Sequence, residues 1–153
     1  MFRLNRLTDY AVVVMTQMAQ HGDTVRTAPQ ISECTGVPLP TVAKILNALH
    51  RESLVNSQRG ATGGYALSRP AAEITVAEII QALEGPIALT ACVDGNSGDC
   101  CVETICPMRG NWDKVNRAIR GALSTVSLED MTPSLLVWDD AEKAAQPAAQ
   151  GAP

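Results

Sequence analysis

The sequence predicts a mainly α fold with a small β-wing, in which a winged helix-turn-helix domain is followed by a long C-terminal dimerisation helix. Three observations support this prediction. Two amphipathic helical segments joined by a short glycine turn precede a glycine-rich hairpin pattern, and a further amphipathic segment lies near residues 108–124. Between them, four of the five cysteines fall within residues 92–106, here called the cysteine segment. At 153 residues and 46% hydrophobic composition, the chain can form one compact domain plus an appendage.

The first helix is predicted to begin near Thr8, which we expect to cap it, and to end near His21. Gly22 lies just past this end, where glycine commonly stops a helix. The apolar positions recur at helical spacing: Tyr10, Val13, Val14 and Met18. This segment therefore presents one apolar face to a core.

A second, short helix and a third helix follow. Thr27 and Gln30 have the spacing of a capping box, which predicts a helix to Cys34 before Gly36 breaks it. The third helix is predicted over residues 40–52, with an apolar stripe of Val42, Ile45, Leu46 and Leu49. Its other face carries Thr41, Lys44, Asn47, His50 and Arg51. The pair is typical of a helix-turn-helix, although the pattern also fits an unrelated helical hairpin.

Residues 54–55 and 65–67 are predicted to form two short strands, a wing after the helix-turn-helix. Gly60, Gly63 and Gly64 allow close backbone approach at its tip, and we nominate them as part of the DNA-binding surface. Arg59 at the wing edge would suit a narrow minor groove, and its alternative is a solvated turn arginine. For direct base reading we nominate Thr41 and Lys44.

Thr75 and Glu78 form another capping box, which predicts a helix through Leu83 that Gly85 and Pro86 end.

We assign residues 1–85 to the winged domain, 86–107 to the cysteine-rich loop, 108–131 to the dimerisation region and 132–153 to a tail, disordered from about 141. The helix over 108–124 has one apolar line, formed by Met108, Trp112, Val115, Ile119 and Ala122. Packing against a second copy would cover it, and packing on its own domain is the alternative.

Charge is unevenly distributed along the chain. Residues 1–70 carry seven basic and four acidic side chains, net +3, whereas the remainder is −7, within a total of −4. This favours a polyanion partner for the N-terminal half. Aromatic residues make up only 3%, which disfavours a base-stacking platform for single-stranded nucleic acid.

Several other classes are disfavoured by missing motifs. The N-terminus lacks the features of a secretory signal, and no apolar run reaches the ~20 residues that a membrane helix needs, so we expect a soluble cytoplasmic protein without a membrane partner. No Ser-His-Asp set, phosphate-binding glycine loop or HExxH motif is found, so we expect neither an enzyme nor a small-molecule substrate.

The cysteine segment predicts a metal or cluster site, because thiolates are the ligands of soft metals and iron-sulfur clusters. Gly95 to Gly98 is loop-forming composition, and Pro107 suits the start of a following helix. A zinc site would normally have paired cysteines two to four residues apart, and here only Cys101 and Cys106 approach that pattern. The same cysteines could instead be redox thiols or small buried side chains, and we expect Cys34 to be structural.

Several blocks in order make the chain resemble the Rrf-two-type bacterial regulators, which include IscR-like and NsrR-like proteins. The blocks are RLTDYAVVVM, ISECTG, SQRGATGGYALS, TVAEIIQALEG and the three cysteines Cys92, Cys100 and Cys106. The resemblance covers about residues 1–130. It implies a homodimeric transcription factor on double-stranded operator DNA whose 2Fe-2S or 4Fe-4S cluster changes operator affinity. The run CCVETICPMRGNWDKVNRAI is most similar to regulators of the SUF iron-sulfur assembly operon, which implies a repressor.

The resemblance implies Cys92, Cys100 and Cys106 as cluster ligands. Family members commonly show C-x5-C-x5-C, and here the first spacing is longer by two residues, so Cys101 is a second candidate for the middle position. IscR-like proteins place a histidine where this chain has Arg109, and NsrR-like proteins use an acidic residue where this chain has Asp9. The resemblance therefore implies Asp9 or Cys101 as a candidate fourth ligand. The alternative for Asp9 is an acidic residue that the helix dipole favours near a helix N-terminus. A nitric oxide or redox sensor, or a zinc or thiol-switch regulator without a cluster, remains the alternative function.

Overall fold

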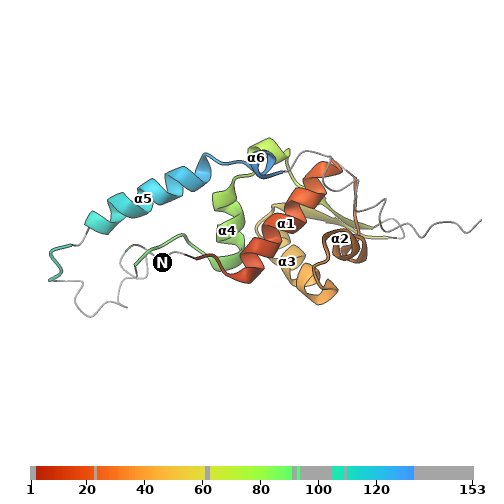
Figure 1. Cartoon of the computed structure of the whole chain (residues 1–153), viewed down its shortest axis with the longest axis horizontal. Helices are drawn as coiled ribbons and strands as arrows, with labels where there is room; N and C mark the ends of the chain where they lie inside the picture. Colours follow the sequence, from red (N-terminus) through yellow and green to blue (C-terminus); the bar gives the residue numbers. More distant parts are fainter. Residues whose placement is uncertain are drawn as a thin grey trace, which may run out of the picture.

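The computed structural model describes residues 3–22, 24–60, 63–90, 93, 105–108 and 110–132. It confirms a mainly helical fold with one two-stranded antiparallel sheet. The elements are α1 (Arg6–Gln20), α2 (Ala28–Thr35), α3 (Leu39–Arg51), β1 (Val55–Gln58), β2 (Gly64–Leu67), a short 3-10 helix η1 (Ala71–Glu73), α4 (Val76–Glu84), α5 (Asn111–Ser124) and α6 (Leu128–Met131). Helices α1 to α4 and the sheet form one body, from which α5 extends to one side (Figure 1).

Helix α1 lies at the centre of this body and is in contact with α2, α3, α4 and α6. Its inward face is fully buried and supplies much of the main core, together with apolar side chains from every neighbouring element. The buried members are Ala11, Val14, Met15, Met18, Ile31, Val37, Val42, Ile45, Leu46, Leu49, Leu54, Val55, Ile74, Ile79 and Leu128. The apolar stripe predicted for the third helix is confirmed by this set. Burial of such a continuous core is the main favourable term in folding.

The start of α1 differs from the prediction. Asn5 caps the helix, because its side-chain oxygen accepts a hydrogen bond from the Thr8 amide at 2.9 Å, and the helix begins at Arg6. The prediction that Thr8 is the cap is therefore wrong. Thr8 is fully buried, and its hydroxyl donates to Glu84 Oε1 at 2.6 Å. Asn and Thr are both common helix caps. Here the Thr8 hydroxyl binds Glu84, 76 positions away in the sequence, and Asn5 is the cap.

The two predicted capping boxes are confirmed, at Thr27 with Gln30 and at Thr75 with Glu78. Burial of Glu78 raises the pKa of its carboxyl, but the hydrogen bonds from Thr75 and Arg69 outweigh this effect, so the pKa lies below its ordinary value. Arg69 lies 2.8 Å from the same carboxylate and thereby joins the chain after β2 to the start of α4. Local signals of this kind fix where α2 and α4 begin.

The wing is a hairpin in which Val55 pairs with Leu67 and Gln58 pairs with Gly64. Its free edge is also occupied, because Arg26 exchanges two backbone hydrogen bonds with Tyr65, at 2.9 and 2.7 Å. Gly64 makes this approach possible, since a Cβ there would lie 2.5 Å from the Arg26 carbonyl oxygen. The wing is thus joined to the segment before α2 as well as to the end of α3.

Helix α5 begins at Asn111, later than the predicted residue 108, after Gly110 in a left-handed conformation with φ of 80°. Only the C-terminal half packs on the domain, where Ile119 and Leu123 contact a small cluster of Val76, Ala77, Ile80 and Ile87. Leu123 takes the place predicted for Ala122, which is exposed.

Helix α6 was not predicted, although its capping box of Ser127 and Asp130 is visible in the sequence. It returns the chain to the main core through the fully buried Leu128. Within the described ranges, no helix is long and apolar enough to cross a membrane.

We predict that Gly64→Ala destabilises the domain by about 1–3 kcal/mol, because the added methyl group would press on the Arg26 backbone. Urea denaturation measures this effect. The control is Gly121→Ala on α5, where a Cβ meets nothing within 4 Å and alanine favours the helix. Equal stability of Gly64→Ala and the wild type would contradict the proposed close approach.

Candidate nucleic-acid interface and metal-binding segment

The outward face of α3 carries the residues nominated for base reading. Lys44 is exposed and Thr41 is half-buried. The helix has no acidic side chain between Leu39 and Arg51, and its other exposed side chains include Asn47 and Arg51. An exposed helix face with cations and no carboxylates is suited to a polyanion such as DNA.

The end of α3 is joined to the wing. The His50 ring nitrogen Nδ1 lies 3.0 Å from the Val55 carbonyl oxygen, a hydrogen bond across the turn between α3 and β1. Arg59 and Gly60 follow β1 directly and are exposed. The nominated residues Thr41 and Lys44 therefore lie on α3, and Arg59 directly follows β1, which is in contact with α3. One ring nitrogen of His50 is thus used in a contact within its own domain.

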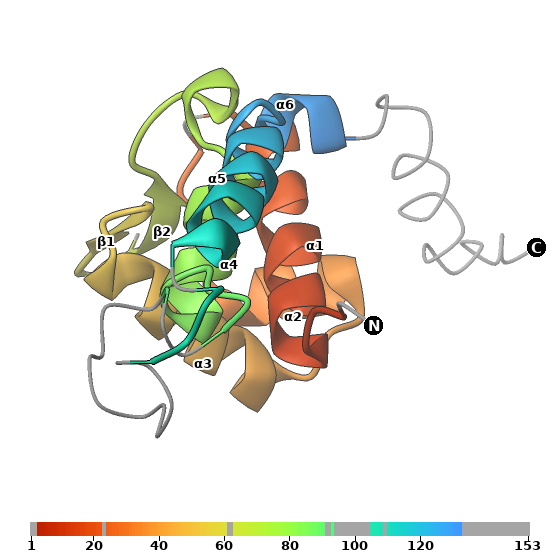
Figure 2. The ribbon, with the colours of Figure 1, turned by 90° about the vertical axis from the view of Figure 1, so that its left-hand side faces the viewer.

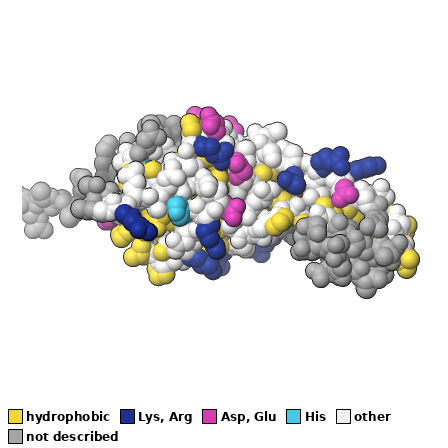
Figure 3. All heavy atoms as spheres, turned by 180° about the vertical axis from the view of Figure 1, so that it is seen from behind, with side chains coloured by type: hydrophobic (Ala, Val, Ile, Leu, Met, Phe, Trp, Pro, Cys, Tyr) yellow, Lys and Arg dark blue, Asp and Glu magenta, His cyan; other side chains and the backbone are white. Residues whose placement is uncertain are grey.

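Gly63 and Gly64, nominated with Gly60 for the DNA-binding surface, also lie close to other backbone atoms of the wing and of the segment before α2. A Cβ at Gly63 would lie 2.6 Å from the Gln58 carbonyl oxygen, and Gly64 faces Arg26. Their close backbone approach is to their own chain, which shapes the wing. Figure 3 shows Lys and Arg side chains at several separate places on one face of the molecule, with acidic side chains between them.

The cysteine segment is described only at its ends. Cys106 is half-buried and lies shortly before α5, whereas Cys92, Cys100 and Cys101 lie outside the described residues. Asp9 is exposed in the first turn of α1, at the end of the domain from which residues 86–90 run out beside α5 (Figure 1). Among the residues with described positions, no group of three or more His, Cys, Asp or Glu side chains could hold a metal ion. The predicted ligand set therefore stays a prediction.

A carboxylate at the end of α4 fixes the start of α1. Glu84 Oε1 accepts hydrogen bonds from the Asn5 amide at 3.1 Å and from the Thr8 hydroxyl at 2.6 Å. A carboxylate at a helix N-terminus is also favoured by the helix dipole. This contact holds the turn that carries Asp9 next to Gly85, where the chain leaves towards the cysteine segment. The contact was not predicted, since nothing local in the sequence relates Glu84 to Asn5.

A buried amide on α5 fixes the chain on the other side of this exit. Asn116 is 4% exposed, donates to the Ile87 carbonyl oxygen at 2.9 Å and accepts from the Leu89 amide at 3.2 Å. In sequence, Asn116 was indistinguishable from other polar residues of an exposed helix. Its position four residues after Trp112 and three before Ile119, on the apolar side of the helix, is the signal that could have identified it.

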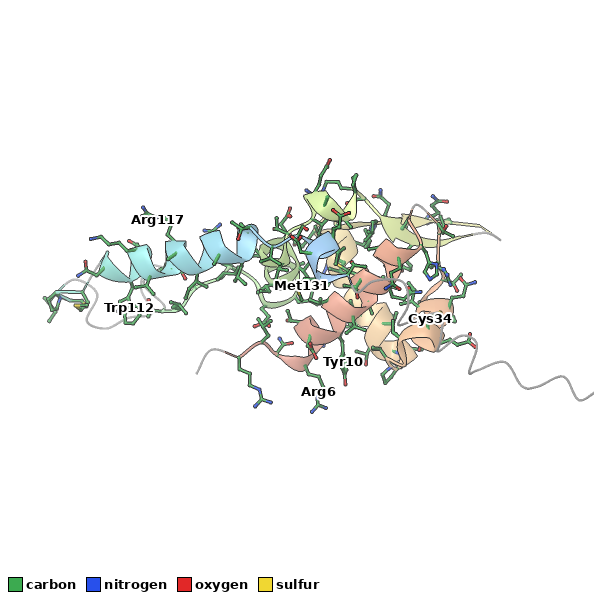
Figure 4. The ribbon with its side chains drawn as sticks, turned by 45° about the horizontal axis from the view of Figure 1, so that its top comes forward. Arg6, Tyr10, Cys34, Trp112, Arg117 and Met131 are labelled. Atoms are coloured by element: carbon green, nitrogen blue, oxygen red, sulfur yellow. The ribbon has the colours of Figure 1, made fainter. Side chains whose placement is uncertain are left out.

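The N-terminal half of α5 has an exposed apolar face. Trp112 is 39%, Val115 45% and Met108 49% exposed, and Ile105 just before them is 80% exposed. Trp112 and Arg117 point to opposite sides of the helix (Figure 4), so the apolar face and the basic face of Lys114, Arg117 and Arg120 are separate. An end-on view places α5 in front of α4, with the wing to one side (Figure 2).

Cys34 lies on α2, away from the cysteine segment in sequence. Its sulfur accepts a weak hydrogen bond from Arg26 Nη1 at 3.9 Å, and the residue is half-buried. This contact ties α2 to the segment that pairs with the wing.

Comparison with known proteins identifies relatives over most of the chain. The sequence model of the Rrf2 family, described as an iron-dependent transcriptional regulator, matches residues 4–134. The transcriptional regulator IscR of Photorhabdus laumondii is 34% identical over 138 residues, which are 90% of this chain and 83% of that protein.

Two solved structures are similar. That of T. potens IscR is 29% identical, with a TM-score of 0.62, covering 98% of this chain and 94% of the other. That of CymR, the global cysteine regulator of B. subtilis, is 25% identical, with a TM-score of 0.66, covering 86% of this chain and 97% of the other. These relatives are regulators, not enzymes.

Proposed function

Because the chain belongs to the Rrf2 family of transcriptional regulators, we propose that it senses an iron-sulfur cluster and binds operator DNA as a homodimer. The observation that carries the proposal is the place of Cys106. It lies between a domain with a DNA-reading helix and a helix, α5, whose apolar half is exposed. A change in the cysteine segment can therefore alter how two winged domains are spaced without touching DNA.

For DNA binding, α3 would enter the major groove and the wing would follow the adjacent minor groove. Lys44 is the exposed cation in the middle of the α3 face, with Thr41 one turn before it. Arg59 extends from the end of β1. Direct contact between α3 and β1 supports the idea that these side chains reach one duplex together.

We predict that Lys44→Ala weakens binding by about 1–3 kcal/mol and relaxes preference at one base pair if the lysine reads a base. If Lys44 contacts phosphate instead, all sequences should weaken alike and the salt dependence of log K should fall by about 1. Operator titrations at several salt concentrations distinguish these cases. The same series applies to Arg59→Ala, whose loss should be felt most at an A·T-rich flank.

The matched control is Lys114→Ala, which removes an exposed lysine from the basic face of α5. It should leave both the affinity and its salt dependence unchanged. Wild-type binding by Lys44→Ala and Arg59→Ala together would contradict the assigned DNA surface.

For the dimer, the exposed half of the apolar line is the proposed contact. Its own domain covers only Ile119 and Leu123, so Trp112 and Val115 remain exposed to solvent in a single chain. Burial of these side chains against the same face of a second copy would give an interface with twofold symmetry. Such a dimer places two α3 helices in one assembly, as two half-sites about one helical turn apart require.

We predict that Val115→Asp dissociates the dimer, because a carboxylate would be buried without a partner in the apolar contact. Sedimentation equilibrium measures the dissociation constant. Arg117→Asp, on the opposite side of α5, is the control and should remain dimeric. A Val115→Asp protein with an unchanged dimer constant would place the interface elsewhere.

For the cluster, Cys92, Cys100 and Cys106 are the proposed thiolate ligands, with Asp9 or Cys101 as the fourth. The donor chemistry fits, because three or four thiolates, or three with one carboxylate, suit iron. When bound, the cluster would supply a redox- and ligand-sensitive group whose presence orders the chain around it. The protein's part is to hold the chain that leads into the segment. Glu84 at the end of α4 binds the start of α1, and Asn116 binds Ile87 and Leu89.

We predict that Cys106→Ala loses the cluster and changes operator affinity by about 5- to 150-fold relative to the loaded protein, while the dimer persists. Anaerobic operator titration together with iron analysis measures both effects. Cys34→Ala is the control for iron content, because Cys34 lies on α2 and outside the segment. Identical operator binding by the loaded wild type and Cys106→Ala would refute cluster sensing.

We further propose that the regulated genes are those of SUF-type cluster assembly and that binding represses them. The support is the similarity of the run from Cys100 to Ile119 to regulators of that operon. A thiol-based regulator is the second candidate, supported by the structural similarity to CymR. Iron-free protein whose DNA binding responds to thiol oxidation would favour it. Nitric oxide sensing would instead appear as a change in operator affinity of the loaded protein on exposure to that gas.

A further inference from the structure

Among the described residues of α5, one side chain is buried, and it is polar. Asn116 is 4% exposed, and both polar atoms of its amide are hydrogen-bonded: Nδ2 donates to the Ile87 carbonyl oxygen and Oδ1 accepts from the Leu89 amide. A buried amide is costly unless it is hydrogen-bonded. Because both bonds go to main-chain groups two residues apart, Asn116 fixes the register of this segment on α5. The apolar contact of Ile87 with α4 and α5 is non-directional and would not fix it.

The place of these bonds in the chain is informative. Leu89 is three residues before Cys92, and Asn116 is ten residues after Cys106. Asn116 therefore joins the two ends of a stretch that contains all four cysteines of the segment. On the entering side, Ile87 is 7% exposed and packs in the cluster between α4 and α5. A shift of the chain at residue 89 would thus reach α5 directly through this side chain.

We propose that Asn116 is a positioning residue that transmits the state of the cysteine segment to α5, an inference that rests on the proposed cluster function. Directional hydrogen bonds make the entering chain and the helix move as one unit. Without them, a change in the cysteine segment is absorbed at Ile87 to Leu89 and does not reorient the helix. Coupling between two sites needs an element whose position changes with the state of either site. Here the sites are the cysteine segment and the proposed DNA-binding surface, and the element is α5.

The test compares Asn116→Leu with Asn111→Leu. Leucine is close to asparagine in size and suits the apolar surroundings, but it removes both hydrogen bonds. Asn111 is the first residue of the same helix and is exposed, so its replacement is a matched control. Iron per chain, operator affinity with and without the cluster, and hydrogen exchange of the Leu89 amide in iron-free protein are measured for each.

In the wild type and in Asn111→Leu, loading should change operator affinity by about 5- to 150-fold. In Asn116→Leu this ratio should fall close to one at an unchanged iron content. The Leu89 amide should also exchange at least about tenfold faster in that variant, because it loses its acceptor. Both results together support the inference.

Other outcomes overturn it. If loading changes the operator affinity of Asn116→Leu as much as that of the wild type, with or without faster exchange of the Leu89 amide, then Asn116 has only a structural role. Loss of iron from the variant would place Asn116 in cluster loading rather than transmission. A wild-type protein that binds no iron, or whose operator affinity is the same with and without the cluster, would refute the proposed function and this inference with it. Measurements on the wild type alone reveal this outcome, so it is distinguishable from failure of the inference.

If Asn116→Leu fails to fold, Asn116→Asp replaces it. The carboxylate keeps an acceptor for the Leu89 amide but loses the donor to Ile87. The affinity ratio should then fall part of the way. An unchanged ratio would overturn the inference.

Discussion

The position of α5 relative to the rest of the molecule depends on the packing of its C-terminal half against α4. Ile119 and Leu123 pack on Val76, Ala77 and Ile80 of α4, and no other part of the described α5 has a buried apolar contact with the domain. This anchors one half of the helix and leaves the half with Trp112 and Val115 exposed. In the proposed dimer, a helix that is fixed at one end and apolar at the other gives a second copy a defined place to bind. It also makes the orientation of that copy sensitive to small changes at the anchor.

Polar contacts at the exit from α4 refine this anchor. Glu84 holds the start of α1, and Asn116 holds the chain that leaves towards the cysteine segment, so both surround Gly85 and Pro86. Apolar packing supplies stability but little directional specificity, whereas these hydrogen bonds specify one arrangement. The proposed DNA-binding side, α3 with the wing, is joined to the same body through the main core. Among the described residues, α4 contacts both α3 and α5, so packed elements connect α5 with the proposed DNA surface.

Sequence reasoning succeeded where the signals are local. The capping boxes at Thr27 and Thr75 and the apolar stripe of α3 depend on residues within a few positions of one another. It failed where a distant contact decides. Asn5 rather than Thr8 caps α1 because Thr8 meets Glu84, and Asn116 is buried because it meets Ile87 and Leu89. At the candidate site, the cysteine spacing predicted the chemistry, while the assignment of Asp9 or Cys101 as fourth ligand depends on positions that spacing alone does not determine.

The most direct test of the central claim is the metal content of the protein. Purified without oxygen, the wild-type chain should show broad visible charge-transfer bands, with iron and acid-labile sulfide in matching amounts per chain. The number of iron atoms per chain would also distinguish a two-iron from a four-iron cluster. A colourless protein that contains zinc, or no metal after reconstitution with iron and sulfide, would contradict cluster sensing.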